Sequence, residues 1–195
     1  MTCVNAGPRA VAAEGVIAVR RRLGVIVAFG ALLGVLGGVV TASPALAGRG
    51  PKWQPPTPGG PPFTLPALYC GFKLRVAFPV NKEFTKVLKA ADGSMTFLFT
   101  GAITTSFTNL QTGKTITEKM NGPGKFFGNP DGSFTEVHTG LNGPFFLTPA
   151  DAQRFGLPTV SVTAGNLAFS VAADGTITSL SLDGHVAVDV CAALS

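Results

Sequence analysis

The chain has 195 residues, of which 46% are hydrophobic and 13% are charged, and its formal net charge is +5. Most of this charge lies near the N-terminus, because residues 48–195 hold 11 basic and 9 acidic side chains, a net charge of +2. A weakly charged region of this length fits one domain with a sizeable core. It lacks the clustered lysine and arginine of nucleic-acid-binding proteins, so we expect no nucleic-acid partner.

The N-terminus has the features of a secretory signal peptide. Three arginines at 20–22 precede an apolar run over 23–40, and Ala45 and Ala47 form an Ala-x-Ala cleavage site. We therefore expect a signal peptide over 1–47 and a secreted, extracellular protein. The alternative is an uncleaved membrane anchor over 23–40, whose 18 residues are near the lower limit for crossing a bilayer. Membrane contact is expected only through such an uncleaved segment.

Residues 48–68 are rich in proline and glycine, a composition that disfavours regular strands and helices. It predicts an extended, disordered tether that serves as a mobile leader, or alternatively as a spacer or a ligand for a proline-binding module. The only tryptophan of the chain, Trp53, lies in this segment and is not assigned to the core.

The folded region is expected to begin at residue 69 with a strand in which Phe72, Leu74, Val76 and Phe78 alternate with other residues. Next, the pair Asp92-Gly93 predicts a hairpin turn between strands over 83–90 and 95–108. A two-residue turn there places Phe84 and Leu88 on the same face as the odd-numbered apolar residues of the second strand.

The middle of the chain continues the strand pattern. Gly101 lies on the apolar phase of its strand and predicts a bend. A strand follows over 115–120, and glycine and proline interrupt it at 121–124. Residues 133–148 form one strand or a hairpin, depending on whether Asn142-Gly143 bends or reverses the chain. One short helix is expected over 149–155, because Thr148 suits the N-cap, Pro149 the first turn and Gly156 the end.

Two further strands complete the chain. The apolar phase of residues 158–173 changes at Gly165, which predicts a bulge. A hairpin at Asp174-Gly175 sets Phe169 opposite Leu180. The last strand is expected to continue through Gly184, because a second turn there would move its valines to the wrong face. The sequence Asp-Gly-Ser/Thr thus recurs at 92, 131 and 174 as a repeated hairpin turn.

These elements predict an all-β fold, an antiparallel meander closed or nearly closed into a barrel of about eight strands over 69–195. A two-sheet β-sandwich is the alternative. Cys70 and Cys191 flank this domain and are expected to form a disulfide bond outside the cell. In a meander the two ends meet only if the strand count is even, which favours eight strands and a hairpin at Asn142-Gly143.

Candidate catalytic and metal-binding residues are few. Residues 48–195 contain two histidines: His138 shares a strand face with Glu136, and His185 shares one with Asp183 and Asp189. Both groups could form a metal site or an acid–base pair, but the solvent-exposed face of a strand has the same pattern. We favour solvated surface, and the common nucleophile, phosphate-loop and zinc motifs do not occur. We therefore expect no catalytic residues, metal or cofactor.

Phenylalanine is the conspicuous residue type, with 14 of 15 copies in residues 48–195. Inward phenylalanines can fill a barrel or line an apolar, lipocalin-like pocket. The pocket candidates are Phe97, Phe99, Phe107 and Phe169. The first functional hypothesis is a secreted, non-enzymatic domain that binds an apolar small molecule or lipid. The others are a cell-envelope or adhesion module with a filled core, and a cyclase- or isomerase-like barrel enzyme.

Several short motifs are similar to those of uncharacterised small secreted proteins from high-GC Gram-positive bacteria. They are the Pro-rich leader, Cys-Gly-Phe at 70–72, Phe-Pro-Val at 78–80, the run at 108–114, Asn-Gly-Pro-Gly at 121–124 and Asp-Val-Cys at 189–191. The resemblance implies export and a β-rich fold, and it implies no activity.

Overall fold

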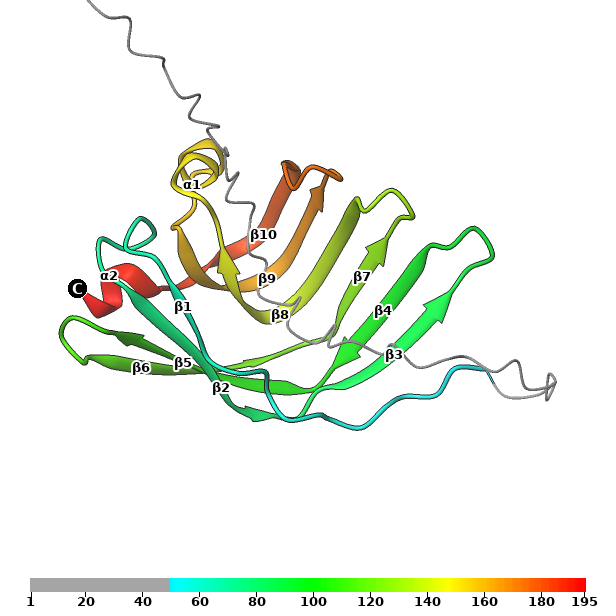
Figure 1. Cartoon of the computed structure of the whole chain (residues 1–195), viewed down its shortest axis with the longest axis horizontal. Helices are drawn as coiled ribbons and strands as arrows, with labels where there is room; N and C mark the ends of the chain where they lie inside the picture. The colour runs from blue at the N-terminus through cyan, green and yellow to red at the C-terminus, as the bar shows by residue number, and fades with distance from the viewer. Residues whose placement is uncertain (1–49) are drawn as a thin grey trace, which may run out of the picture.

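The computed structural model describes residues 50–195, so the predicted signal peptide lies outside the described residues. This part of the chain folds into one ten-stranded antiparallel sheet with two short helices (Figure 1). The elements are β1 (Phe63–Leu65), β2 (Leu74–Asn81), β3 (Phe84–Lys89), β4 (Met95–Thr100), β5 (Ala102–Asn109), β6 (Thr115–Asn121), β7 (Gly124–Gly128), β8 (Phe134–Phe146), α1 (Pro149–Phe155), β9 (Val160–Val171), β10 (Ile177–Asp189) and α2 (Val190–Leu194).

Nine of the ten strands form six long ribbons in meander order. Only Gly101 separates β4 from β5, and only two residues separate β2 from β3 and β6 from β7. The strands β8, β9 and β10 are the other three ribbons, and β1 pairs with the outer edge of β2. The sheet forks at β8, because β8 pairs with β7 before Gly140 and with β6 at Leu141.

A row of glycines crosses the ribbons at the fork. Gly140, Gly165 and Gly184 are directly opposite one another in three adjacent strands. A side chain is excluded here, because a Cβ at Gly184 would lie 2.9 Å from the Cα of Gly165 and a Cβ at Gly140 would lie 2.7 Å from the carbonyl oxygen of Asn121. We call this row the glycine crease; its members, all with positive φ, are Gly101, Gly122, Gly140, Gly165 and Gly184.

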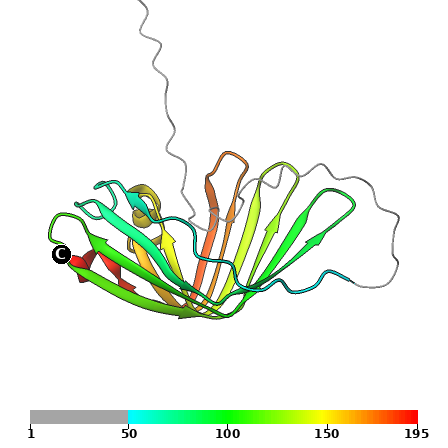
Figure 2. The same cartoon turned by 60° about the horizontal axis from the view of Figure 1, so that its bottom comes forward.

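The crease divides the sheet into a floor and three raised hairpins. Figure 1 shows β2, β5 and β6 forming the floor, while the hairpins β3–β4, β7–β8 and β9–β10 rise from it side by side, as Figure 2 shows from another direction. The predicted bend at Gly101 is therefore confirmed. The bulge predicted at Gly165 is wrong, because the β9–β10 pairing passes Gly165 without a register shift.

One core cluster lies on the floor. Leu74, Val76 and Phe107 are fully buried there, and α2 and the segment between β1 and β2 pack against the same cluster. The predicted disulfide between Cys70 and Cys191 is present, with the two Cα atoms 5.0 Å apart. It joins the start of the first ribbon to the end of the last.

A second core cluster lies between α1 and the β9–β10 hairpin. Ala152 of α1 packs with Leu167, Phe169 and Ile177 of the sheet. The helix forms as predicted, because the hydroxyl of Thr148 accepts a hydrogen bond from the Asp151 amide (3.1 Å) and Gly156 ends the helix in the left-handed conformation.

The all-β antiparallel fold is confirmed, and the sheet remains open, with β10 and the β1 and β3 strands at its edges. The hairpin predicted at Asn142-Gly143 is wrong, because β8 runs unreversed from Phe134 to Phe146 with a register shift between Asn142 and Phe145. The two cysteines nevertheless meet, since six ribbons are also an even number.

The pairing predicted for the first hairpin is wrong by one residue. Its loop has three residues, with Gly93 in a left-handed conformation and the Ala90 amide bonded to the Ser94 carbonyl. Lys89 therefore pairs with Met95, and this register moves Phe84 and Leu88 to the opposite face. The hairpin at Asp174 has the same loop, but a register shift between Ile177 and Ser179 restores the predicted pair of Phe169 and Leu180.

The tether predicted over 48–68 is ordered where it meets the sheet. Its end forms β1, in which Leu65 is fully buried, and Gln54 pairs with Thr85 on the edge of β3. The disordered tether is thus a wrong prediction for those positions. Within residues 50–195, neither helix has the length and apolar character needed to cross a bilayer.

Candidate functional site

One face of the raised hairpins carries most of the aromatic side chains in that half of the sheet. Directly opposite residues of an antiparallel sheet point to the same side, so two adjacent cross-strand rows share this face. The first row is Phe97, Phe126, Glu136 and Phe169, and the second is Phe99, Gly124, His138 and Leu167. We call this surface the aromatic face; it consists of Met95, Phe97, Phe99, Phe126, Phe134, Glu136, His138, Leu167 and Phe169.

The rings on the aromatic face pack against one another. Phe126 stacks on Phe134 with ring centroids 4.9 Å apart, and Phe97 meets Phe126 edge-on at 5.7 Å. Aromatic pairs of this geometry stabilise their neighbours beyond the burial of area. Phe97, Phe126 and Phe134 are nevertheless only half-buried, so solvent reaches one side of the cluster.

A glycine in β7 makes room for one of these rings. A Cβ on Gly124 would overlap the ring of Phe99, so only glycine lets that ring lie across the neighbouring strand. The Phe99 ring centroid is 5.2 Å from that of His138. The interruption of the strand pattern at 121–124 therefore brings an aromatic ring against the histidine.

Glu136 and His138 form a buried pair in the middle of the aromatic face. Their exposed fractions are 1% and 7%, and Oε1 of Glu136 is 2.8 Å from Nε2 of His138. The other carboxylate oxygen, Oε2, is buried and has no hydrogen-bond partner. The His138 ring also lies parallel to the ring of Phe169, with a centroid separation of 6.5 Å.

The expectation that Glu136 and His138 lie on a solvated surface is therefore wrong. Phe126 and Phe169 on the adjacent strands flank Glu136, and Phe134 precedes it on the same face of β8. Strand alternation alone could not show that this face is covered. The corresponding expectation for His185 is confirmed, because its side chain is exposed on β10.

A second carboxyl group lies near the pair. Glu83 follows β2 and precedes β3, with the same phase along the strand as Thr85, whose partner is Phe99. Burial raises the pKa of Glu83, and the positive charge of protonated His138 acts in the opposite direction. No motif in the sequence indicated Glu83, because its proximity to His138 depends on the crease.

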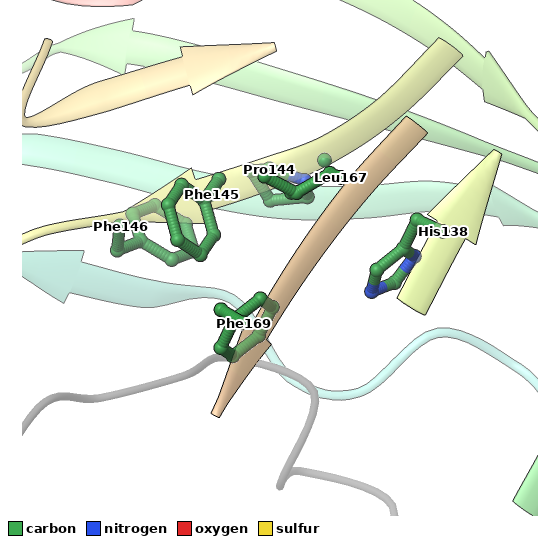
Figure 3. Close-up of a pocket in the computed structure, with 7 residues that line it drawn as sticks. His138, Pro144, Phe145, Phe146, Leu167 and Phe169 are labelled. Carbon is green, nitrogen blue, oxygen red and sulfur yellow. The ribbon is translucent and has the colours of Figure 1, made fainter. Parts of the chain in front are cut away.

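A small cavity lies beside His138, between the two core clusters. Its volume is about 10 Å³, which is room for about one water molecule. In Figure 3, Phe145 and Phe146 of β8 lie on one side of the cavity and His138 on the other. The lining residues are His138, Gly143, Pro144, Phe145, Phe146, Leu167 and Phe169.

The structure brings three of the four predicted pocket residues onto one surface. Phe97, Phe99 and Phe169 belong to the aromatic face, whereas Phe107 is fully buried in the core cluster of the floor. A pocket shared by all four is therefore not formed. Phe126 and Phe134 were missed, because Phe134 shares its phase in β8 with Glu136 and His138, and each phase of β7 holds one phenylalanine.

The arrangement could supply an apolar binding surface with an acid–base pair at its centre. Among residues 50–195, no group of three or more His, Cys, Asp or Glu side chains could hold a metal ion.

No protein-family model, curated protein or solved structure matches this chain.

Proposed function

We propose that the protein binds an apolar small molecule or lipid on the aromatic face, as a non-enzymatic β-domain. The single observation that carries the proposal is the buried Oε2 of Glu136, which has no partner in the middle of a face of half-buried phenyl rings. A buried acceptor without a partner costs about 1–3 kcal/mol. A ligand that donates a hydrogen bond to Oε2 would remove this cost.

The charges around the site favour a particular ligand chemistry. Glu83 and Glu136 are two carboxyl groups, against one imidazole at His138. An anionic head group would be repelled by this set when the carboxyl groups are ionised. The best ligand is therefore an apolar body, which covers the rings of Phe97 and Phe126, with a hydroxyl or amine group that reaches Glu136.

Native mass spectrometry of protein purified from its own host tests the proposal. We expect a co-purifying compound of a few hundred daltons, the size range of ligands that fill protein pockets. The compound should be lost in Phe97→Ala and retained in Phe84→Ala. The two phenylalanines lie in the same hairpin but on opposite faces, so the second variant is a matched control. A bare protein mass obtained in repeated preparations contradicts the proposal.

A second candidate function is acid–base catalysis on the same ligand, and the buried Glu136–His138 pair is the observation that favours it. General acid–base catalysis needs a titratable pair within hydrogen-bond reach in a desolvated site. If the protein is an isomerase- or cyclase-like enzyme, a recovered ligand should be converted on incubation. His138→Gln should then abolish conversion while ligand binding remains.

Export and the resemblance to small secreted proteins of high-GC Gram-positive bacteria are part of the proposal. The disulfide between Cys70 and Cys191 supports an oxidising compartment, where such bonds persist. N-terminal sequencing of the protein recovered from the culture medium tests cleavage after Ala47. Recovery only in the membrane fraction, with residues 23–40 retained, contradicts it.

A further inference from the structure

The opposite face of the raised hairpins carries exposed apolar side chains. Among residues 50–195, seven large hydrophobic side chains are exposed; four belong to this face and its edge, and a fifth, Val80, lies on the same side of the adjoining floor strand β2. Their exposed fractions run from 36% for Leu88 to 47% for Trp53. We call them the outer patch, together with two lysines between them; its members are Trp53, Val80, Phe84, Lys86, Leu88, Lys125 and Phe127.

Strand pairing makes the outer patch contiguous. Leu88 and Phe127 both lie opposite Thr96 of the intervening strand, and Lys86 and Lys125 both lie opposite Leu98. Gln54 pairs with Thr85, so the alternation of extended backbone places Trp53 beside Lys86. Three aromatic residues and a leucine therefore surround one pair of lysines.

The charge of this surface has one sign. Strands β3 and β7 contain lysines, β4 contains no charged residue, and none of the three strands contains aspartate or glutamate. Glu83 has the phase of Thr85, whose partner is Phe99, and so lies on the other face. The acidic side chains Asp92 and Asp131 lie in the hairpin loops beyond the strand ends. An approaching surface with negative charge would thus meet only cations between the apolar side chains.

We propose that the outer patch binds the surface of an anionic lipid bilayer. Tryptophan and phenylalanine partition to the headgroup region, and each lysine near anionic lipid adds attraction. A second copy of the chain fits less well, because a two-fold contact through this patch would bring the lysines of both copies into one interface with no acidic residue in it. The proposal is independent of the aromatic face, whose side chains point to the other side of the sheet.

Trp53 is the only tryptophan of the chain and lies in the outer patch, so its fluorescence reports binding directly. The full-length chain is expressed, and the protein is purified in the form that its host cells produce. It is then mixed with vesicles of phosphatidylcholine containing 30% phosphatidylglycerol, or of phosphatidylcholine alone. We expect a blue shift of Trp53 emission, and quenching by brominated acyl chains, with the anionic vesicles.

Two double variants distinguish binding through the outer patch from general electrostatic attraction between the protein and the vesicle. Lys86→Glu/Lys125→Glu should weaken binding to anionic vesicles by at least about tenfold, since each lysine near anionic lipid is worth about 1 kcal/mol. Lys73→Glu/Lys114→Glu changes the net charge equally on exposed side chains of the floor and should bind as the unmodified protein does. Comparison between these variants is valid whether or not residues 23–40 are retained.

Three outcomes overturn the proposal. The first is unchanged Trp53 emission with anionic vesicles. The second is equal quenching in the two double variants, which would mean that charge anywhere on the molecule suffices. The third is equal binding to neutral vesicles, which would leave the lysines of the patch without a role. Binding to a soluble acidic protein in the absence of any vesicle effect would instead assign the patch to a protein partner.

Discussion

The carboxylate of Glu136 and the imidazole of His138 lie on the same face of β8, with Oε1 and Nε2 2.8 Å apart and both side chains buried. An ion pair or hydrogen-bonded pair in an apolar site is weak evidence for stability, since desolvation offsets the attraction. The presence of such a pair on a surface of phenylalanines is better explained by a role in binding or in chemistry.

A comparison of single and double variants tests this interpretation. His138→Phe alone should lower the free energy of unfolding by about 3 kcal/mol, because both oxygens of Glu136 would then be buried without a partner. Glu136→Leu/His138→Phe should be as stable as the unmodified protein or more so, while losing ligand binding. Urea denaturation measures both values. A double variant less stable than the single one would show that the pair is structural.

Stability should also depend on pH through Glu83. Its pKa is raised mainly by burial, so the folded state holds this proton more tightly than the unfolded state. The contribution of Glu83 to the free energy of unfolding should therefore be fully present below its ordinary pKa of about 4.5 and should be lost as the pH rises through the folded-state pKa. Glu83→Gln should remove this decrease in urea titrations between pH 4 and 8. An identical slope in the variant would contradict the assignment.

Two aspartates affect the pH dependence of stability in the opposite direction from Glu83, and they do so at lower pH. Hydrogen bonds from Ser94 and Ser133 lower the pKa of Asp92 and Asp131, respectively. Their contribution to stability is present above the ordinary pKa of 3.8 and is lost as the pH falls below it. Asp92→Asn/Asp131→Asn should therefore flatten the acid limb of the stability profile and leave the slope assigned to Glu83 unchanged. Loss of that slope in the double variant would link the two groups and contradict this separation.

The sequence was informative where one local pattern decides the outcome. Alternation identified the strands, Thr148 and Gly156 bounded the helix, and the valine phase carried the last strand through Gly184. Prediction from the sequence failed where a contact between distant parts of the chain decides the structure. The burial of Glu136 depends on the rings of neighbouring strands, and the approach of Glu83 to His138 depends on a sheet folded across several glycines. The alternation of residues within a single strand does not indicate either arrangement.

The first hairpin shows a second kind of failure. A two-residue and a three-residue loop share the pair Asp-Gly, and their registers differ by one residue. The wrong choice moved Phe84 and Leu88 from the outer patch to the aromatic face. The hairpin at Asp174 has the same loop and was correctly paired only because a bulge near Ile177 compensates.

The glycine crease can be tested with a matched pair of substitutions. Gly165 and Gly113 both have positive φ, but a Cβ at Gly165 would lie 2.7 Å from the Cα of Gly184, whereas a Cβ at Gly113 would meet nothing within 4 Å. Gly113→Ala should cost about 1–2 kcal/mol from backbone strain. Gly165→Ala should cost about 1–3 kcal/mol more, from crowding. Equal losses in thermal denaturation would show that backbone conformation alone requires the glycine.

The disulfide should be the largest single contribution of a side-chain pair to stability. Cys70 and Cys191 are separated by 121 residues, and closing a loop of that size stabilises the folded state by about 4–5 kcal/mol in the chain-entropy model. The bond also fixes the segment before β2 to α2, beside the Thr159 hydroxyl that donates to the Tyr69 carbonyl. Cys70→Ser/Cys191→Ser should therefore lower the melting temperature by well over 10 °C, and reduction of the unmodified protein should have the same effect.

The control is Thr159→Val, which removes the neighbouring hydrogen bond and should cost only about 0.5–1.5 kcal/mol. A double serine variant that melts within a few degrees of the unmodified protein would mean that the floor and α2 hold the two ends together without the covalent link.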